Sequence, residues 1–374
     1  MRSGTSRVSP RALCMLAFLL AAYPPELQAD DPSREVPVCS QRLLAVGDIM
    51  LSGSARPVFR VKGYAYAFQD RALARLTSRA DVAFGNLEYP ITRSGSPIKD
   101  KKYTFRGSLE SLKAVKGAGF DMLSLANNHI MDYGVKGLMD TLMQCRKNRL
   151  VHAGAGTDLT TASRPGIVVR NGVRYGLLAY SMTFPEDFWA TKDRPGTAHP
   201  DITRMDLDIR AVRPAVDILI VSFHWGEELM REPKQYQVGF ARYAIRSGAD
   251  VVVGHHPHVP QAIEIYRGRP IFYSLGNYAF GSISSASTVS IAAETIFQRY
   301  NPVQVNIYPL NVSNKEVGFQ PRLAKGNTAE KIIAHLREIS LPFGTPISFR
   351  KGIGTITIAP EDDRATPADR PAGS

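Results

Sequence analysis

Short apolar runs that end in polar residues recur along this chain, and they constrain its fold more than any other feature. Each run is nearly continuous in hydrophobic residues instead of alternating, as expected for a strand that is covered on both faces. Six such runs lie at residues 42–46, 81–84, 121–126, 217–223, 250–253 and 270–275. Each of them leads directly into a segment that carries Asp, Glu, Asn or His.

Stretches with helical periodicity separate several of these runs, at residues 68–79, 109–118, 135–147 and 235–247. The order strand, polar loop, helix, strand is typical of α/β proteins, whose ligands bind beyond the carboxyl ends of the strands. A hairpin is predicted at residues 167–180, with Asn171 and Gly172 in a type I′ turn. Two further strands and a helix are expected at residues 303–310, 352–358 and 329–338.

Carboxylate, amide and imidazole side chains follow the predicted strands. The set comprises Asp48, Glu88, Asn128, His224, His256 and His258. Oxygen and nitrogen ligands of this kind suit Mn, Fe or Zn, and they do not suit copper or an iron–sulfur cluster. We therefore expect a site for one or two divalent metal ions. A pair of ions could clamp a phosphoryl group for in-line attack.

Two further residues near this set are candidates for catalysis. His129 directly follows Asn128, and it is a candidate general acid or orienting group instead of a ligand. Asp132 is expected on the first turn of the next helix, where it could hold the imidazole in one tautomer. Some residues of these segments also suit purely structural roles. Asn128, taken alone, suits a turn. His255 is expected to be a loop residue, and Trp225 is expected to pack in the core.

The first 29 residues have the layout of a secretory signal peptide. Arg2, Arg7 and Arg11 precede an apolar stretch over residues 12–23, and Ala29 supplies a small residue before an acidic pair. Twelve helical residues reach about 18 Å, which is short of a bilayer core of about 30 Å. We therefore expect export to the periplasm or cell envelope. The alternative is an uncleaved signal that anchors the protein in the membrane.

The rest of the chain is expected to comprise a linker, one α/β domain and a disordered tail, at residues 30–41, 42–358 and 359–374. Removal of the signal would also remove Cys14. Cys39 and Cys145 would then remain in an oxidising compartment. They could form one disulfide, or both could stay unpaired.

The chain is strongly basic, with 46 Lys and Arg against 34 Asp and Glu, a net charge of +12. Loss of three Arg and one Glu with the signal leaves +10. The charge suggests an anionic partner. Nucleic acid is a poor candidate, because the basic residues are scattered and an exported protein would rarely meet it. An anionic envelope polymer or lipid headgroup is the natural hypothesis. No apolar run reaches the roughly 18–20 residues of a membrane span, which excludes a polytopic membrane protein.

These motifs resemble the CapA family of poly-γ-glutamate capsule-synthesis proteins. The resemblance covers residues 43–280 and is carried by GDIML (47–51), GNLE (85–88), ANNHIMDYG (126–134), HWGEE (224–228), GHHPHV (254–259) and YSLGNYAF (273–280). The family belongs to the calcineurin-like metallophosphoesterase superfamily. The resemblance therefore implies a four-layer α/β/β/α sandwich around a dinuclear metal centre.

The resemblance also implies a role for each motif residue. It makes Asp48 a ligand from the first strand, Glu88 the bridging carboxylate and Asn128 the amide ligand. His129 would be the catalytic imidazole, and the later histidine ligands would be His224, His256 and His258. Two departures from the superfamily pattern stand out: Met50 replaces the usual histidine of an Asp-x-His motif, and Glu88 replaces a bridging Asp.

Two classes of function compete on this basis. In the first, the protein is an exported metal-dependent hydrolase of a phosphoester or polymer linkage, and the retained His129 and Asp132 favour this. In the second, it is a non-catalytic component that binds or exports polymer, and Met50 favours that. Both hypotheses imply poly-γ-glutamate or a similar anionic polymer as partner, together with membrane-bound capsule-synthesis proteins. The oligomeric state is not predicted.

Overall fold

A computed structural model describes residues 40–359 of the chain. The predicted signal peptide, most of the predicted linker, Cys39 and nearly all of the predicted tail lie outside the described residues. Among residues 40–359, no helix is long and apolar enough to cross a membrane.

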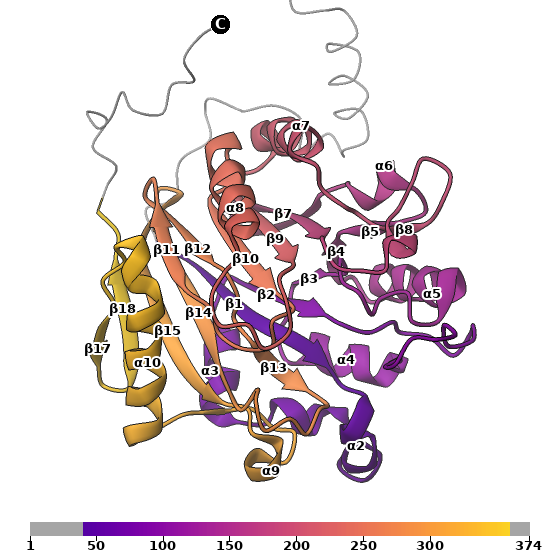
Figure 1. The fold of residues 1–374 in the computed structure, drawn as a ribbon, viewed down its shortest axis with the longest axis horizontal. Helices are drawn as coiled ribbons and strands as arrows, with labels where there is room; N and C mark the ends of the chain where they lie inside the picture. Colours follow the sequence, from indigo (N-terminus) through magenta and orange to yellow (C-terminus); the bar gives the residue numbers. More distant parts are fainter. Residues whose placement is uncertain (1–39, 360–374) are drawn as a thin grey trace, which may run out of the picture.

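A ten-stranded mixed sheet forms one half of the described structure (Figure 1). Its main path runs in the order β17-β18-β15-β14-β1-β2-β3-β4, with β13 beside β1 and β16 beside β15. One side of β1 is parallel and consists of β1 (Gln41–Met50), β2 (Val82–Leu87), β3 (Met122–Ser124) and β4 (Val151–Ala153), with β13 (Asn277–Phe280) also parallel to β1. The other side is antiparallel and consists of β14 (Val289–Gln298), β15 (Asn301–Asn311), β16 (Arg322–Leu323), β17 (Ser348–Arg350) and β18 (Ile353–Thr357).

A six-stranded sheet packs against the first, in the order β11-β12-β10-β9-β7-β6. Its strands are β6 (Gly166–Arg170), β7 (Val173–Ser181), β9 (Ile218–His224), β10 (Val251–His255), β11 (Ile263–Tyr266) and β12 (Arg269–Phe272). The four central strands, β7, β9, β10 and β12, are parallel. A separate two-stranded ribbon pairs β5 (Ala155–Gly156) with β8 (Gly196–Thr197).

Alternation along the strands divides the core into three layers of side chains. On β9, Ile220 packs between the two sheets, whereas Val221 packs toward the helices on the outer face. On β1, Leu43 packs between the sheets and Leu44 faces the helices on the opposite side. Because β1 and β9 are covered on both faces, their sequences are largely apolar.

Helices complete the outer layers (Figure 1). Side chains of α3 (Arg71–Arg79), α4 (Leu109–Gly117) and α5 (Gly134–Lys147) join the core on the outer face of the ten-stranded sheet. Side chains of α7 (Ile202–Val212) and α8 (Gln235–Ser247) cover the six-stranded sheet. The remaining α-helices within residues 40–359 are α2 (Arg56–Lys62), α6 (Leu159–Ala162), α9 (Asn314–Val317) and α10 (Gly326–Ser340). The predicted α/β/β/α sandwich is therefore confirmed.

The local predictions agree closely with the observed elements. The six apolar runs correspond to β1, β2, β3, β9, β10 and β12, and the four helical stretches to α3, α4, α5 and α8. Asn171 and Gly172 have φ values of 52° and 77°, as a type I′ turn requires. β14, which joins the parallel and antiparallel parts of the large sheet, was not predicted.

Candidate metal centre

The predicted ligands come together where strands of both sheets end. Asp48 lies in β1, Glu88 follows β2 by one residue, and Asn128 follows β3. His224 is the last residue of β9, and the other two histidines follow β10. The ten-stranded sheet thus supplies Asp48, Glu88 and Asn128, and the six-stranded sheet supplies His224, His256 and His258.

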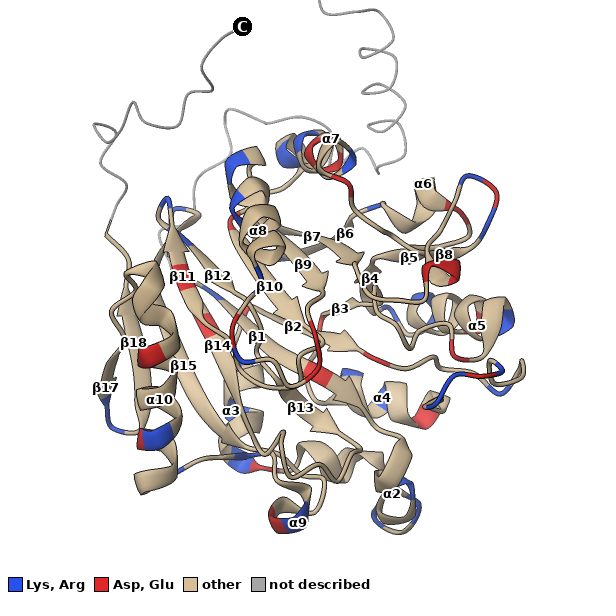
Figure 2. Ribbon diagram, viewed as in Figure 1, with Lys and Arg blue, Asp and Glu red and all other residues tan. Residues whose placement is uncertain are grey.

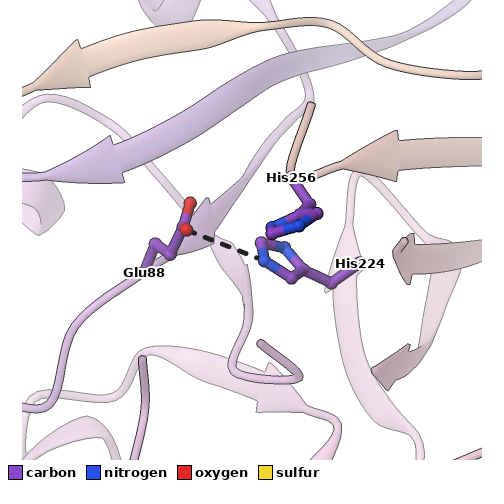
Figure 3. A group of neighbouring side chains, drawn as sticks. All are labelled: Glu88, His224 and His256. Carbon is purple, nitrogen blue, oxygen red and sulfur yellow. Dashed lines mark ion pairs between the residues drawn. The ribbon is translucent and has the colours of Figure 1, made fainter. Parts of the chain in front are cut away.

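Glu88 lies at the centre of the arrangement and belongs to two groups of possible ligands. One group comprises Glu88, His224 and His256, and the other comprises Asp48, Glu88 and His258. Within each group the ligand atoms lie within 4.8 Å of one another. Figure 3 shows the first group, with all three side chains pointing toward one another. A carboxylate shared in this way is suited to bridge two metal ions.

The polar atoms of Glu88 and His256 support this interpretation. Oε1 of Glu88 is buried without a hydrogen-bond partner among the described residues, and so is Nδ1 of His256. The same Oε1 lies 3.6 Å from Nε2 of His224 and 3.9 Å from Nε2 of His258. Buried polar atoms are normally hydrogen-bonded, and such exceptions call for a missing ion or water. The residues therefore fit a divalent metal site.

Asp48 is held by the backbone and side chains around it. Nδ2 of Asn86 donates to its Oδ1 over 2.8 Å, and the backbone N–H of His256 donates to Oδ2 over 3.3 Å. Nδ1 of His258 lies 3.2 Å from Oδ2, and Nδ1 of His255 lies 3.1 Å from Oδ1. These contacts fix the direction of the carboxylate before any ion binds.

The amide of Asn128 joins the histidine-rich group. Its Oδ1 lies 2.9 Å from Nε2 of His224. On the other side of the ring, Nδ2 of Asn86 lies 3.3 Å from Nδ1 of His224 and 3.4 Å from Oε2 of Glu88. Asn86 in turn accepts a hydrogen bond from Asn127 over 3.0 Å. The centre is therefore supported by a buried amide network beneath the ligands.

Backbone geometry explains the glycines of the motifs. A Cβ on Gly47 would lie 1.8 Å from the carbonyl oxygen of Gly276, and one on Gly254 would lie 2.0 Å from that of Tyr273. Only glycine allows such close approach of neighbouring backbones. His256 and His258 have positive φ values of 96° and 59°. Non-glycine residues rarely adopt this conformation, and it is common at functional sites.

The two carboxyl groups respond to this environment in opposite directions. Burial opposes ionisation of Asp48, but the close imidazoles of His255 and His258 hold its pKa well below the usual value. Burial raises the pKa of Glu88 well above its usual value, and the charges of Asp48 and Glu228 add to the effect. Without a cation, a second buried negative charge at Glu88 is therefore unfavourable.

The imidazoles are also perturbed. Burial lowers the pKa of His224 well below its ordinary value and that of His256 to about 3, with neighbouring histidines adding to both effects. Burial acts in the same direction on His258, but the hydrogen bond and charge of Asp48 outweigh it, so that the pKa is raised. His224 and His256 are therefore neutral at neutral pH, as metal ligands must be.

His129 and Asp132 form a buried pair beside the metal ligands. Nδ1 of His129 lies 2.8 Å from Oδ2 of Asp132, so the expected contact is present. Asp132 lies in the turn before α5, and not on its first helical turn as predicted. Burial lowers the pKa of His129 against the opposing effect of Asp132. With Nδ1–H directed at the carboxylate, Nε2 is the atom free to exchange a proton.

His255, Trp225 and Met50 are all fully buried. His255 is not a loop residue: it is the last residue of β10, fully buried, and its contact with Asp48 explains its place. Trp225 packs in the core as expected, stacked on Phe223. Met50 is fully buried in the core below the site and is not part of either group of possible ligands.

Sequence reasoning missed four polar residues that touch the predicted ones, namely Asn86, Asn127, Asn277 and Lys101. Oδ1 of Asn277 lies 2.9 Å from Nδ1 of His258. Three of the four lie inside the quoted motifs, so the motifs themselves were the available signal. Lys101 lies in a polar segment without periodicity, and no pattern marked it.

The layered fold, with a buried carboxylate shared by two groups of possible metal ligands, defines a protein of the metallophosphoesterase-like class. The metal-binding role of the individual residues stays a prediction. The chain belongs to the family described as bacterial capsule synthesis protein PGA_cap, which matches residues 42–282. The resemblance of the motifs to the CapA family is thereby confirmed.

Two curated relatives illustrate this membership. The chain is 33% identical over 275 residues to the capsule biosynthesis protein CapA of Bacillus anthracis, covering 71% of this chain and 66% of that protein. It is 37% identical over 237 residues to the PGA biosynthesis protein CapA of Bacillus subtilis (strain 168), covering 63% and 62%. The match thus spans slightly less than two thirds of each relative.

Two solved structures show a distant similarity to this chain. A hypothetical protein from Thermus thermophilus has a TM-score of 0.48 at 17% identity, covering 72% of this chain and 99% of that one. A 5′-nucleotidase precursor from the same organism has a TM-score of 0.44 at 13% identity, covering 80% and 59%. At this level of similarity, they add nothing to the assignment of a function.

Proposed function

We propose that this protein acts in the biosynthesis of an anionic capsule polymer, such as poly-γ-glutamate, and hydrolyses a phosphoester or polymer linkage at the Glu88 centre. The names of the relatives support a role in capsule biosynthesis, since both CapA proteins are named for capsule or PGA biosynthesis. The single observation that supports chemistry is the fully buried Oε1 of Glu88, which lies between two imidazoles and has no hydrogen-bond partner among residues 40–359.

Each part of the site has a role in this proposal. Asp48, Glu88 and His258 would hold one divalent ion, and Glu88, His224 and His256, with the Asn128 amide, would hold a second. Mn, Fe and Zn all suit these ligands. When bound, such ions supply Lewis-acid chemistry at an anionic oxygen of the substrate.

The chain's own contribution to the reaction centres on His129. Asp132 fixes the imidazole through Nδ1, which leaves Nε2 to exchange a proton with the attacking or leaving oxygen. The centre of the Phe105 ring lies 4.8 Å from the centre of the imidazole ring. Removal of His129 should therefore reduce turnover strongly without removing the metal.

The test is turnover of bis(p-nitrophenyl) phosphate by the full chain loaded with Mn²⁺. We expect hydrolysis by the wild type and a loss of about 10²–10⁴-fold in His129→Ala, the usual contribution of general acid–base catalysis. His335→Ala is the matched control, because His335 lies on α10 and contacts Arg231, away from the ligands. A folded, metal-loaded protein without turnover would rule out the hydrolase.

One observation favours a second candidate, a polymer-binding component without turnover. Met50 occupies the position of the superfamily's usual histidine, and it is fully buried in the core. The histidine position of this motif therefore supplies no ligand in this chain. Retention of polyglutamate by a metal-loaded but inactive protein would favour this candidate.

We also propose export to the periplasm or cell envelope, on the pattern of residues 1–29. Lys and Arg are spread over α2, α3, α5, α7, α8 and α10 (Figure 2), which suits a diffuse attraction to an anionic polymer and its membrane-bound synthesis partners. Fractionation of cells that make the full chain, with sequencing of its amino terminus, tests both export and cleavage. A cytoplasmic, uncleaved product would contradict the proposal.

A further inference from the structure

Lys101 lies against the turn that carries Asn128, His129 and Asp132. Its Nζ contacts the carbonyl oxygen of Asn128 and Oδ1 of Asp132, and it lies 3.3 Å from Nδ1 of His129. The side chain is only 17% exposed, and its ammonium also lies 5.1 Å from the centre of the Phe188 ring. One buried cation therefore joins the turn to the segment before β8.

The segment around Lys101 makes further contacts with the same turn. The backbone N–H of Ile98 donates to the carbonyl oxygen of Asp132 over 2.9 Å, and that of Phe105 donates to its Oδ2 over 2.6 Å. The segment from residue 98 to 105 contains no helix or strand, so its shape depends on these contacts. We call residues 98–105 the strap.

We propose that Lys101 is a positioning residue, which fixes the 128–132 turn so that the Asn128 amide stays beside His224 and the His129 imidazole stays against Asp132. The ammonium restrains the peptide between Asn128 and His129 at its carbonyl oxygen. It also restrains the carboxylate that orients the imidazole. Both restraints come from one group, so its removal should loosen a candidate ligand and a candidate catalytic residue together.

Metal affinity provides the first test, because it does not depend on turnover. Lys101→Met keeps an unbranched side chain of similar length and removes the ammonium that lies over Phe188. Lys102→Met is the matched control, since Lys102 is exposed and lies over the Tyr103 ring. We expect calorimetric titration with Mn²⁺ to show a loss of about 10–100-fold in Lys101→Met, the usual effect of removing a residue that orients a ligand. The control should bind like the wild type.

A double-mutant cycle separates positioning from general loss of structure. If Lys101 acts on the metal through Asn128, Lys101→Met should have little further effect on affinity in an Asn128→Ala background. An equal loss in both backgrounds, or an unchanged affinity in Lys101→Met, would overturn the proposal. Lys101→Gln, which keeps a hydrogen-bond donor, replaces Lys101→Met in the cycle if the methionine variant does not fold.

Turnover provides the second test and rests on the proposed function. With bis(p-nitrophenyl) phosphate, Lys101→Met should lower kcat about 10–100-fold with KM within about twofold of the wild type. Lys101→Arg should restore part of kcat, because it keeps the charge. A rise in KM alone would instead make Lys101 a substrate contact and overturn the proposal. If the wild type binds metal without turnover, the hydrolase fails, and the metal titration alone decides the role of Lys101.

Discussion

Nε2 of His224 lies 3.6 Å from Oε1 of Glu88, although the two residues belong to different sheets. His224 ends β9 of the six-stranded sheet, and Glu88 follows β2 of the ten-stranded sheet. The two sheets must therefore pack before the ligands can meet. Metal binding should in turn stabilise the packing between the sheets, because an ion that binds only the folded state shifts the equilibrium toward it.

Replacement of the shared carboxylate should affect both groups of ligands at once. Glu88→Gln keeps the shape of the side chain and removes the charge that two cations would share. We expect metal content to fall at both positions, measured by elemental analysis after dialysis against Mn²⁺. Glu330→Gln, at an exposed position of α10, is the control. A variant that keeps the full metal content would show that Glu88 is not a ligand.

In the metal-free protein, His224 and His256 should make the folded state less stable as the pH falls below about 6.5. His256 titrates at about 3 in the folded state but near 6.5 in the unfolded chain, and the pKa of His224 is lowered as well. Between these pH values the unfolded chain binds more protons, so acid lowers the free energy of unfolding. The raised pKa values of Glu88 and His258 act in the opposite direction, because their contributions are present at low pH and are lost as the pH rises.

Urea unfolding in EDTA at a series of pH values measures this effect. His256→Asn should flatten the pH dependence between about pH 6.5 and about pH 3 by up to about one proton. An unchanged slope in the variant would mean that His256 is protonated in the folded protein.

A methyl group at Gly47 should disturb the site and the fold together. The added Cβ would meet the carbonyl oxygen of Gly276, which also accepts the backbone N–H of Asp48 over 3.0 Å. We expect Gly47→Ala to lower the free energy of unfolding by about 1–3 kcal/mol or more, as overpacking does, and to weaken Mn²⁺ binding. Gly117→Ala in α4 meets no atom within 4 Å and should not destabilise the protein. Chemical denaturation compares the two.

The thiol of Cys145 should be inert in the folded protein. The residue is fully buried and unpaired in the described structure, and burial raises its pKa to about 12. In a Cys39→Ser background, we expect Ellman's reagent at about pH 8 to react with Cys145 only after denaturant is added. Rapid reaction of the native variant would contradict the observed burial.

Much of the fold could be predicted because the strands of a double-sided sheet are continuously apolar. β14 escaped this rule because it contains Glu294, whose carboxylate is buried against Arg42, Arg79 and Tyr308. A charged residue in a strand interrupts the apolar pattern, and its partners come from distant parts of the chain. Local sequence therefore gives no sign that the charge is compensated.

The candidate site could be predicted from the sequence to a similar degree. The motifs at the strand ends indicated the candidate ligands, because parallel strands present their carboxyl ends at the same edge of a sheet. The contacts between the ligands depend on how two sheets pack, which no local pattern records. The role of Asn86 could not be predicted for this reason, since its amide contacts residues of both sheets. The position of Lys101 could not be predicted, because the strap takes its shape only from tertiary contacts.

If Glu88 is shared by two metal positions, the protein should bind two divalent ions. The full chain, stripped with EDTA and then titrated with Mn²⁺ in a calorimeter, should bind two ions per chain, with elemental analysis confirming the count. Loss of both ions in Glu88→Gln would identify the shared ligand. A folded protein that binds no divalent ion, or that binds two ions equally well without Glu88, would show that Glu88 is not a shared metal ligand.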